Sequence, residues 1–240
     1  MKDYLSYSQL KAFAKSPNHY LAYLEQVFEP TPQMTLGSAL HSQLLTPDLF
    51  LEQYAVAQKH DRRTKAGKAA AEEQDKLLEG KTVMTEEQMD IIRKIVDAVL
   101  LNSHSQQTLQ QSQGFEVEKF GVIHGERFKA IADMVGDTWV ADLKTCADAS
   151  PEGFMRAAHN LDYHLQAAIY RAVFGVSDFY WIAAETSAPF NVQVYKQSEE
   201  AKLFSDRKLY NLVQAYQRWD GNPQGYSSQI LALDLPRWAN

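Results

Sequence analysis

Apolar residues follow two different periods along this chain. Near both ends they recur every three or four positions, as in amphipathic helices, whereas from about residue 115 to 145 they alternate, as in strands. Helices are expected from Ser6, from Ser16, over Leu36–Leu45, over residues 85–99, around 105–110, from Ser150, over 163–174 and over 198–219. Strands are expected over residues 116–123, 126–135, 139–144, 179–184 and 191–196. This order predicts an α/β (α+β) fold, with a central mixed sheet flanked by helices and N-terminal helices wrapping it.

Local signals fix several of these boundaries. Ser6 with Gln9, and Thr85 with Gln88, match the capping box that begins a helix. The dipeptides His124-Gly125 and Gly136-Asp137 each join two strand-like runs and predict hairpins. Because we find no internal repeat and no low-complexity linker, we expect residues 1–240 to form a single domain.

Two segments fit this pattern less well. Residues 59–81 are highly charged, and we expect a flexible loop that runs into a helix. The C-terminal tail is expected to be a loop that packs down at Trp238, after Pro236.

Composition narrows the class of protein. Cys146 is the single cysteine, which excludes a disulfide framework and a cysteine-ligated zinc or iron–sulfur site within one chain. The net charge of −6 argues against a protein that grips nucleic acid over its whole surface, but not against one that binds DNA in a groove. No apolar run approaches the roughly 20 residues of a membrane span. With no signal-peptide core at the N-terminus, we expect a cytoplasmic protein without a membrane partner.

The chemistry of greatest interest lies in the stretch from Phe128 to Thr145. Asp133 comes near the end of one strand, and the next strand carries Asp142 and Lys144, which alternation places on one face. Two carboxylates suit a hard cation such as Mg²⁺, and a lysine beside them can orient or deprotonate an attacking water. A solvated salt bridge at a strand end is the alternative, and these three residues do not decide between the two.

His41 and one helix face are further candidates. Imidazole is a common metal ligand, although a lone histidine on an apolar helix is more often a core residue. Tyr163, Gln166 and Tyr170 have spacings of three and four, which place them on one helical face. Rings there could stack on bases and the amide could bind a phosphate, or the face could simply border the core.

The densest basic cluster is Asp61–Lys68, with Arg62, Arg63, Lys65 and Lys68. It could contact phosphates or be a solvated loop. Glu116 and Glu118 share a strand face, and we place them at the surface or around the site rather than in it. No glycine-rich phosphate loop and no G-x-S-x-G elbow occurs.

Taken together, these motifs resemble the PD-(D/E)XK nuclease superfamily, and within it the RecE-type, or exodeoxyribonuclease VIII-like, exonucleases of phage and prophage. The likeness rests on five segments in order, and it covers nearly the whole chain. They are LSYSQLKAFAKSPNHY, LGSALHSQLLTPDLF, DRRTKAGK, the pair KAIADMVG and VADLKT, and YHLQAAIY. Alanine, not proline, precedes Asp133, and the second acid is aspartate.

The resemblance implies roles for named residues. His41, Asp133, Asp142 and the carbonyl of Leu143 would bind Mg²⁺ or Mn²⁺, as two ions per site. Lys144 would be the catalytic lysine, and Gln166 and Tyr170, with Tyr163 nearby, would support the site or the DNA.

It also implies an activity. The chain would digest linear double-stranded DNA from 5′ to 3′, leaving a 3′ single strand for an annealing protein, and would form a ring of three or four subunits. Three alternatives stay open: an endonuclease of the same fold in repair or restriction, a non-catalytic DNA-binding protein, and a hydrolase of another phosphoester.

Overall fold

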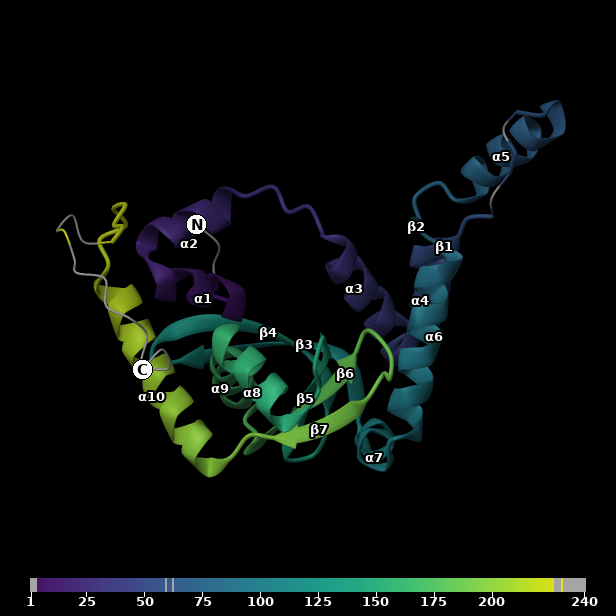
Figure 1. Ribbon diagram of the computed structural model, residues 1–240. Coiled ribbons are helices and arrows are strands. Elements are labelled where there is room, and N and C mark those ends of the chain that lie inside the picture. The colour runs from purple at the N-terminus through teal and green to yellow at the C-terminus, as the bar shows by residue number, and fades with distance from the viewer. Residues whose placement is uncertain (1–3, 59, 62, 227–229, 231–240) are drawn as a thin grey trace.

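A computed structural model describes residues 4–58, 60, 61, 63–226 and 230 of the chain (Figure 1). The elements in chain order are α1 (Tyr7–Lys15), α2 (Pro17–Glu25), α3 (Pro32–Leu45), α4 (Pro47–Gln53), β1 (Tyr54–Val56), α5 (Lys65–Leu77), β2 (Thr82–Met84), α6 (Glu86–Leu101), α7 (Ser103–Gln111), β3 (Gly114–Ile123), β4 (Glu126–Val135), β5 (Trp139–Cys146), α8 (Pro151–Asn160), α9 (Tyr163–Phe174), β6 (Asp178–Glu185), β7 (Val192–Lys196) and α10 (Glu199–Arg218). The mixed α+β class and both capping boxes are as predicted.

The central sheet has the strand order β3-β4-β5-β6-β7. Neighbouring strands run antiparallel except for β5 and β6, which are parallel and are joined through α8 and α9. The β3–β4 hairpin is long, with its register fixed by the turn at His124-Gly125. By contrast, β4 and β5 pair only at Met134 with Ala141 and at Val135 with Val140. Beyond these two pairs the strands part, and this divergence creates the candidate site described below.

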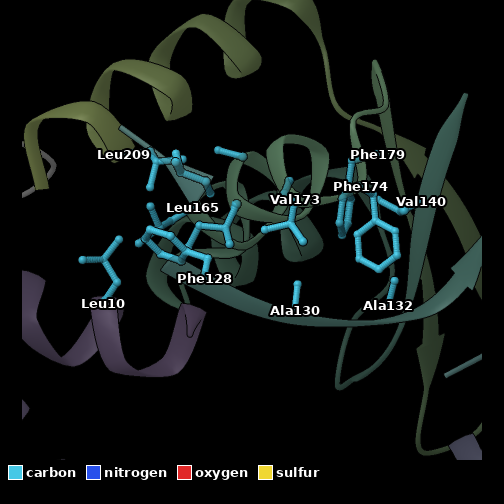
Figure 2. Close-up of a cluster of buried hydrophobic side chains, with 14 of the residues drawn as sticks. Leu10, Phe128, Ala130, Ala132, Val140, Leu165, Val173, Phe174, Phe179 and Leu209 are labelled. Carbon is cyan, nitrogen blue, oxygen red and sulfur yellow. The ribbon is translucent and has the colours of Figure 1, made fainter. Parts of the chain in front are cut away.

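Helices cover both faces of the sheet and give it two hydrophobic cores. On one face α9 packs against β3–β6 and α10 packs against α9 and α1. Figure 2 shows Leu10 of α1 and Leu209 of α10 near Phe128 of β4. On the other face α3 and α6 pack against β5 and β6, with Leu40, Ile92 and Leu143 in their core. The wrapping N-terminal helices are therefore split, with α1 on one side of the sheet and α3 on the other.

An aromatic cluster fastens the N-terminal helix pair to the C-terminal helix. Phe13 and Tyr20 pack against Tyr216 and Trp219 with ring centroids 5.3–5.6 Å apart, in edge-on or tilted orientations that aromatic pairs prefer. The backbone also helps, because Leu5 forms a parallel bridge with Phe128 on β4. These contacts hold α1 in a fixed position beside the sheet.

The segment between α3 and α6 differs most from the prediction. It contains a helix, α4, and two short parallel strands, β1 and β2, which the sequence pattern did not reveal. The expected helix after the charged loop is present as α5, which projects away from the sheet (Figure 1). Three-residue strands are too short to show a period, which explains the omission. The tail prediction at Pro236 and Trp238 falls outside the described residues.

Replacing Phe128 with alanine should destabilise the fold strongly. Its side chain is fully buried between the sheet and α9, and large-to-small changes of this kind typically cost about 3–5 kcal/mol. Phe120→Ala on the adjacent strand is a matched control, since Phe120 is 48% exposed. Chemical denaturation of both variants measures the difference. Equal losses of free energy of unfolding would show that Phe128 does not anchor this core.

Among the described helices, none is long and apolar enough to cross a membrane.

Candidate functional site

The site begins where β4 and β5 separate. Leu143 lies on β5 beyond the last β4–β5 pair, so its backbone groups on that side have no strand partner. Side chains take the place of the strand: the Leu143 N–H donates to Asp133 Oδ2 at 2.7 Å, and His41 Nε2 lies 2.8 Å from the Leu143 carbonyl oxygen. The gap between two diverging strands is thus closed by a carboxylate and an imidazole.

His41 comes from α3 and meets Asp133 directly. Its Nδ1 lies 3.3 Å from Asp133 Oδ2. Gly37, one turn earlier on α3, lies close to the sheet, because a Cβ built there would be 3.6 Å from Thr145 Oγ1. The helix thereby brings His41 into the site rather than into a remote core.

Glu116 is the residue that the sequence analysis left outside the site. Its Oε1 lies 3.7 Å from His41 Nδ1, and the ligand atoms of His41, Glu116 and Asp133 lie within 4.8 Å of one another. The register of the β3–β4 hairpin explains this proximity. Phe115 pairs with Met134 and Val117 pairs with Ala132, so Glu116 and Asp133 lie opposite each other between these two pairs. A two-residue turn at His124-Gly125 would have predicted that register from the sequence.

The backbone around this pair is irregular. Glu116 has φ 50°, in the left-handed region that non-glycine residues rarely adopt, and it does not pair with Asp133. Ala132 and Met134 should share one face of β4, yet they pack in different cores. This break in the alternation frees the Asp133 carboxylate to reach Leu143. Backbone outliers of this kind are concentrated at functional sites.

Asp142 and Lys144 form the second half of the site. As alternation predicts, they lie on the opposite face from the buried Leu143 side chain, towards α9. Lys144 Nζ lies 2.6 Å from Asp142 Oδ2, and Gln166 Nε2 of α9 donates to Asp142 Oδ1 at 2.7 Å. Asp142 is not one of the three residues in the compact His41 cluster.

The tyrosines of α9 line the same region. Lys144 Nζ lies 4.9 Å from the centre of the Tyr163 ring, a cation–π contact. Burial, followed by the charge of Asp142, raises the pKa of Tyr170 to about 12. Tyr163 and Gln166 of the predicted face therefore contact the Asp142–Lys144 pair. Tyr170 of the same face packs against Phe179.

Charge interactions in the site are strong because it is buried. Burial alone would lower the pKa of His41, but the charge of Asp133 and the hydrogen bond with Glu116 raise it to about 9. Burial and the nearby Asp142 raise the pKa of Asp133 to about 7. Burial opposes protonation of Lys144, yet Asp142 and Asp133 outweigh it and raise its pKa. Without a metal ion, the site therefore retains protons to unusually high pH.

The basic run is far from these residues in the fold. Lys65 and Lys68 lie on the projecting helix α5 (Figure 1). Arg63 is occupied by an ion pair with Asp61, with Nε 3.0 Å from Oδ1. Arg62 lies outside the described residues. The structure therefore does not bring this run to the site, and any contact with DNA would be made at a distance from it.

The donor set of the site fits a divalent ion. Two carboxylates and an imidazole converge, and a third carboxylate lies close enough for its charge to raise the pKa of Asp133. Oxygen ligands of this kind suit Mg²⁺ or Mn²⁺. His41, Glu116 and Asp133 would hold the ion, with the Leu143 carbonyl in contact with His41.

Metal binding should strengthen as pH rises. The folded, metal-free protein holds protons more tightly than the unfolded chain, on Asp133 up to about pH 7 and on His41 up to about pH 9. The protonated forms of Asp133 and His41 therefore stabilise the metal-free fold, and this contribution to the free energy of unfolding is lost as pH rises through their pKa values. The deprotonated forms are the ones that bind a metal ion, so metal affinity increases over the same pH range. We expect Mg²⁺ to raise the melting temperature more at about pH 9 than at about pH 6. In the His41→Gln variant, this dependence of the Mg²⁺-induced rise in melting temperature on pH should be smaller. If Mg²⁺ raises the melting temperature of the wild-type protein equally at every pH, the prediction is wrong.

The class of protein is shown by comparison with known families, which identifies a PDDEXK-like domain. The family model described as "PDDEXK-like domain of unknown function (DUF3799)" matches residues 6–221, and the chain belongs to this family. No curated protein matches the sequence well enough to be reported as a relative.

Solved structures share the fold at low sequence identity. A candidate exonuclease from Eubacterium rectale is 12% identical, with a TM-score of 0.64 over 99% of this chain and 92% of that one. The alkaline exonuclease LHK-Exo from Laribacter hongkongensis is also 12% identical, with a TM-score of 0.34 over 90% of this chain and 88% of that one. The first similarity establishes the same overall architecture along nearly the entire chain.

Proposed function

We propose that this chain is a metal-dependent DNA exonuclease. The observation that carries the proposal is the meeting of His41, Glu116 and Asp133 beside the Asp142–Lys144 pair, where β4 and β5 part. A surface salt bridge would need no such convergence of ionisable side chains from three separate elements around the buried Asp133. Membership of the PDDEXK-like family and the likeness to a candidate exonuclease support the same reading.

Each group has a chemical task in this proposal. His41, Glu116 and Asp133 would hold one divalent ion, and Asp142 with the Leu143 carbonyl would complete the ligands of a two-ion site. A bound ion would supply Lewis acidity, which activates water and offsets charge on the phosphate. Gln166 fixes the orientation of Asp142 through their 2.7 Å hydrogen bond.

Lys144 would act mainly through its positive charge. The neighbouring carboxylates raise its pKa, so it carries a proton at neutral pH in the metal-free protein. A cation there can orient the attacking water and stabilise the negative charge that develops on the phosphate. It lies over the Tyr163 ring, which limits the positions that the ammonium can adopt.

The finer assignment rests on the sequence motifs. We propose a RecE-type enzyme that uses Mg²⁺ or Mn²⁺ and digests linear duplex DNA from 5′ to 3′ for recombination by strand annealing. The annealing protein, the ring of three or four subunits and the cytoplasmic location are parts of the same proposal. Tyr163, Gln166 and Tyr170 would border the DNA, while Arg63, Lys65 and Lys68 would contact it away from the site.

Comparing a linear plasmid with its closed circular form tests this proposal. An exonuclease degrades the linear form in the presence of Mg²⁺ and leaves the circle whole. Cutting of the circle would favour the rival endonuclease of the same fold. If calorimetry detects no metal binding and neither form is digested, the chain is a non-catalytic DNA-binding protein instead. Digestion of a different phosphoester alone would indicate the third alternative.

A further inference from the structure

The chain between α2 and α3 leaves the body of the protein and then returns to it. Residues 22–34 are all exposed, and we call this segment the arch. It includes the end of α2, the connector through Pro30 and the first residues of α3. Figure 1 shows it passing over the β3–β4 hairpin from α2 to α3. The arch includes Val27, which is 84% exposed, and Phe28, which is 63% exposed, so two apolar side chains of this segment lie largely outside the core of the described chain.

Both ends of the arch are anchored beside the site. On one side the hydroxyl of Tyr7 of α1 donates to the Leu161 carbonyl oxygen. Burial, followed by nearby charges that include Asp162 and Asp142, raises the pKa of Tyr7. On the other side His41 of α3 lies against Leu143. The arch, its two anchoring helices and the sheet therefore form a closed path of protein around the site.

A hollow of about 720 Å³ lies between α1 and α2, at the start of the arch. It is lined by α1, α2 and the first residues of the arch, including Tyr7, Lys11, Lys15, His19, Tyr23 and Gln26. Lysines can neutralise phosphates and tyrosine rings can stack on bases, which together suit a single strand. Glu25 adds one negative charge to the lining.

We propose that the arch encloses one DNA strand at the site, so that the strand must be threaded from a free end. This inference rests on the proposed function, and it explains within one subunit why the enzyme would need a free DNA end. An unbroken protein chain over the site cannot be crossed by a strand that lacks an end. The requirement for linear DNA would then not depend on a ring of subunits.

The arch can be cut without removing either of its anchors. The α1–α2 pair is held by the aromatic cluster of Phe13, Tyr20, Tyr216 and Trp219, with ring contacts to α10 and the residue after it. The α3 helix is held by the buried Leu40 in the core beneath α6. A cut within the connector should therefore open the enclosure and leave the site assembled.

A trapping experiment tests the inference. A single-stranded oligonucleotide with biotin at both ends is bound in the presence of EDTA, both ends are capped with streptavidin, and excess competitor is added. We expect the caps to slow release at least about tenfold, because a threaded strand can leave only by an end. A variant with a protease recognition sequence inserted after Glu29 should behave likewise until it is cut, and then release the strand at the uncapped rate. The chain without the insertion, treated with the same protease, is the control.

The outcomes separate this inference from the proposed function. If the oligonucleotide binds but is released equally fast with and without streptavidin caps, the threading inference is wrong and the proposed function still stands. Trapping that survives cleavage of the arch also overturns it, because another element would then enclose the strand. Failure to bind the oligonucleotide counts against both. Trapping without any digestion of linear DNA in Mg²⁺ supports threading and contradicts the exonuclease.

Discussion

Replacing Lys144 with methionine should reduce digestion of linear DNA by about 10²–10³-fold, the usual loss when one preorganised group that stabilises developing negative charge is removed. Methionine keeps the length of the side chain but removes the ammonium that lies 2.6 Å from Asp142 Oδ2. The water and the phosphate would lose the cation that orients one and stabilises the other. Rates measured at saturating Mg²⁺ would show this loss mainly in kcat.

Two controls make this result specific. Lys129→Met removes another lysine from the same sheet, one that pairs with Glu118 away from the site, and should leave the rate nearly unchanged. Loss of Lys144 also leaves the buried Asp142 without its counter-charge, so the melting temperature of the variant must be measured in parallel. Digestion at the wild-type rate by folded Lys144→Met would exclude a catalytic role.

Glu116→Gln should weaken binding of Mg²⁺ by about tenfold or more, since changes in groups around a metal commonly cost 10–100-fold in affinity. The substitution keeps the shape of the side chain but removes one of the two carboxylates in the compact cluster. Calorimetric titration with Mg²⁺ would measure the change directly. Digestion at low Mg²⁺ should fall with it and recover in part at high Mg²⁺.

Glu118→Gln is the matched control for this prediction. Glu118 lies two residues further along β3 and pairs with Lys129 rather than with His41. Its replacement should leave Mg²⁺ affinity unchanged. If the two variants bind Mg²⁺ equally well, Glu116 is not a ligand, and the alternative is a site built on Asp133, Asp142 and the Leu143 carbonyl without it.

The sequence predicted the framework of the site because its signals are local or strongly periodic. The alternation around Leu143 correctly placed Asp142 and Lys144 on the face that α9 covers. Spacings of three and four correctly placed Tyr163 and Gln166 on one side of that helix. Ordered motifs then linked these strands to His41, about a hundred residues earlier in the chain, and the structure does bring them together.

Other features depend on geometry that no local pattern shows. The parting of β4 and β5, which leaves the Leu143 backbone without a strand partner on that side, follows from the packing of whole layers. The positive φ of Glu116 breaks the alternation on which strand assignments rely, so its role was missed although the hairpin register pointed to it. The projecting position of α5 could not be foreseen either, because a basic run has the same sequence beside a site or far from it.

Digestion of linear duplex DNA labelled separately at its 5′ and 3′ ends, with Mg²⁺ and with EDTA, tests the central claim most directly. The account predicts that wild-type protein releases the 5′ label first, only in Mg²⁺, and that Lys144→Met releases neither label. First release of the 3′ label would contradict the RecE-type polarity and leave the nuclease standing. Absence of release from either end in Mg²⁺, by folded protein shown to bind the metal, would contradict the account as a whole.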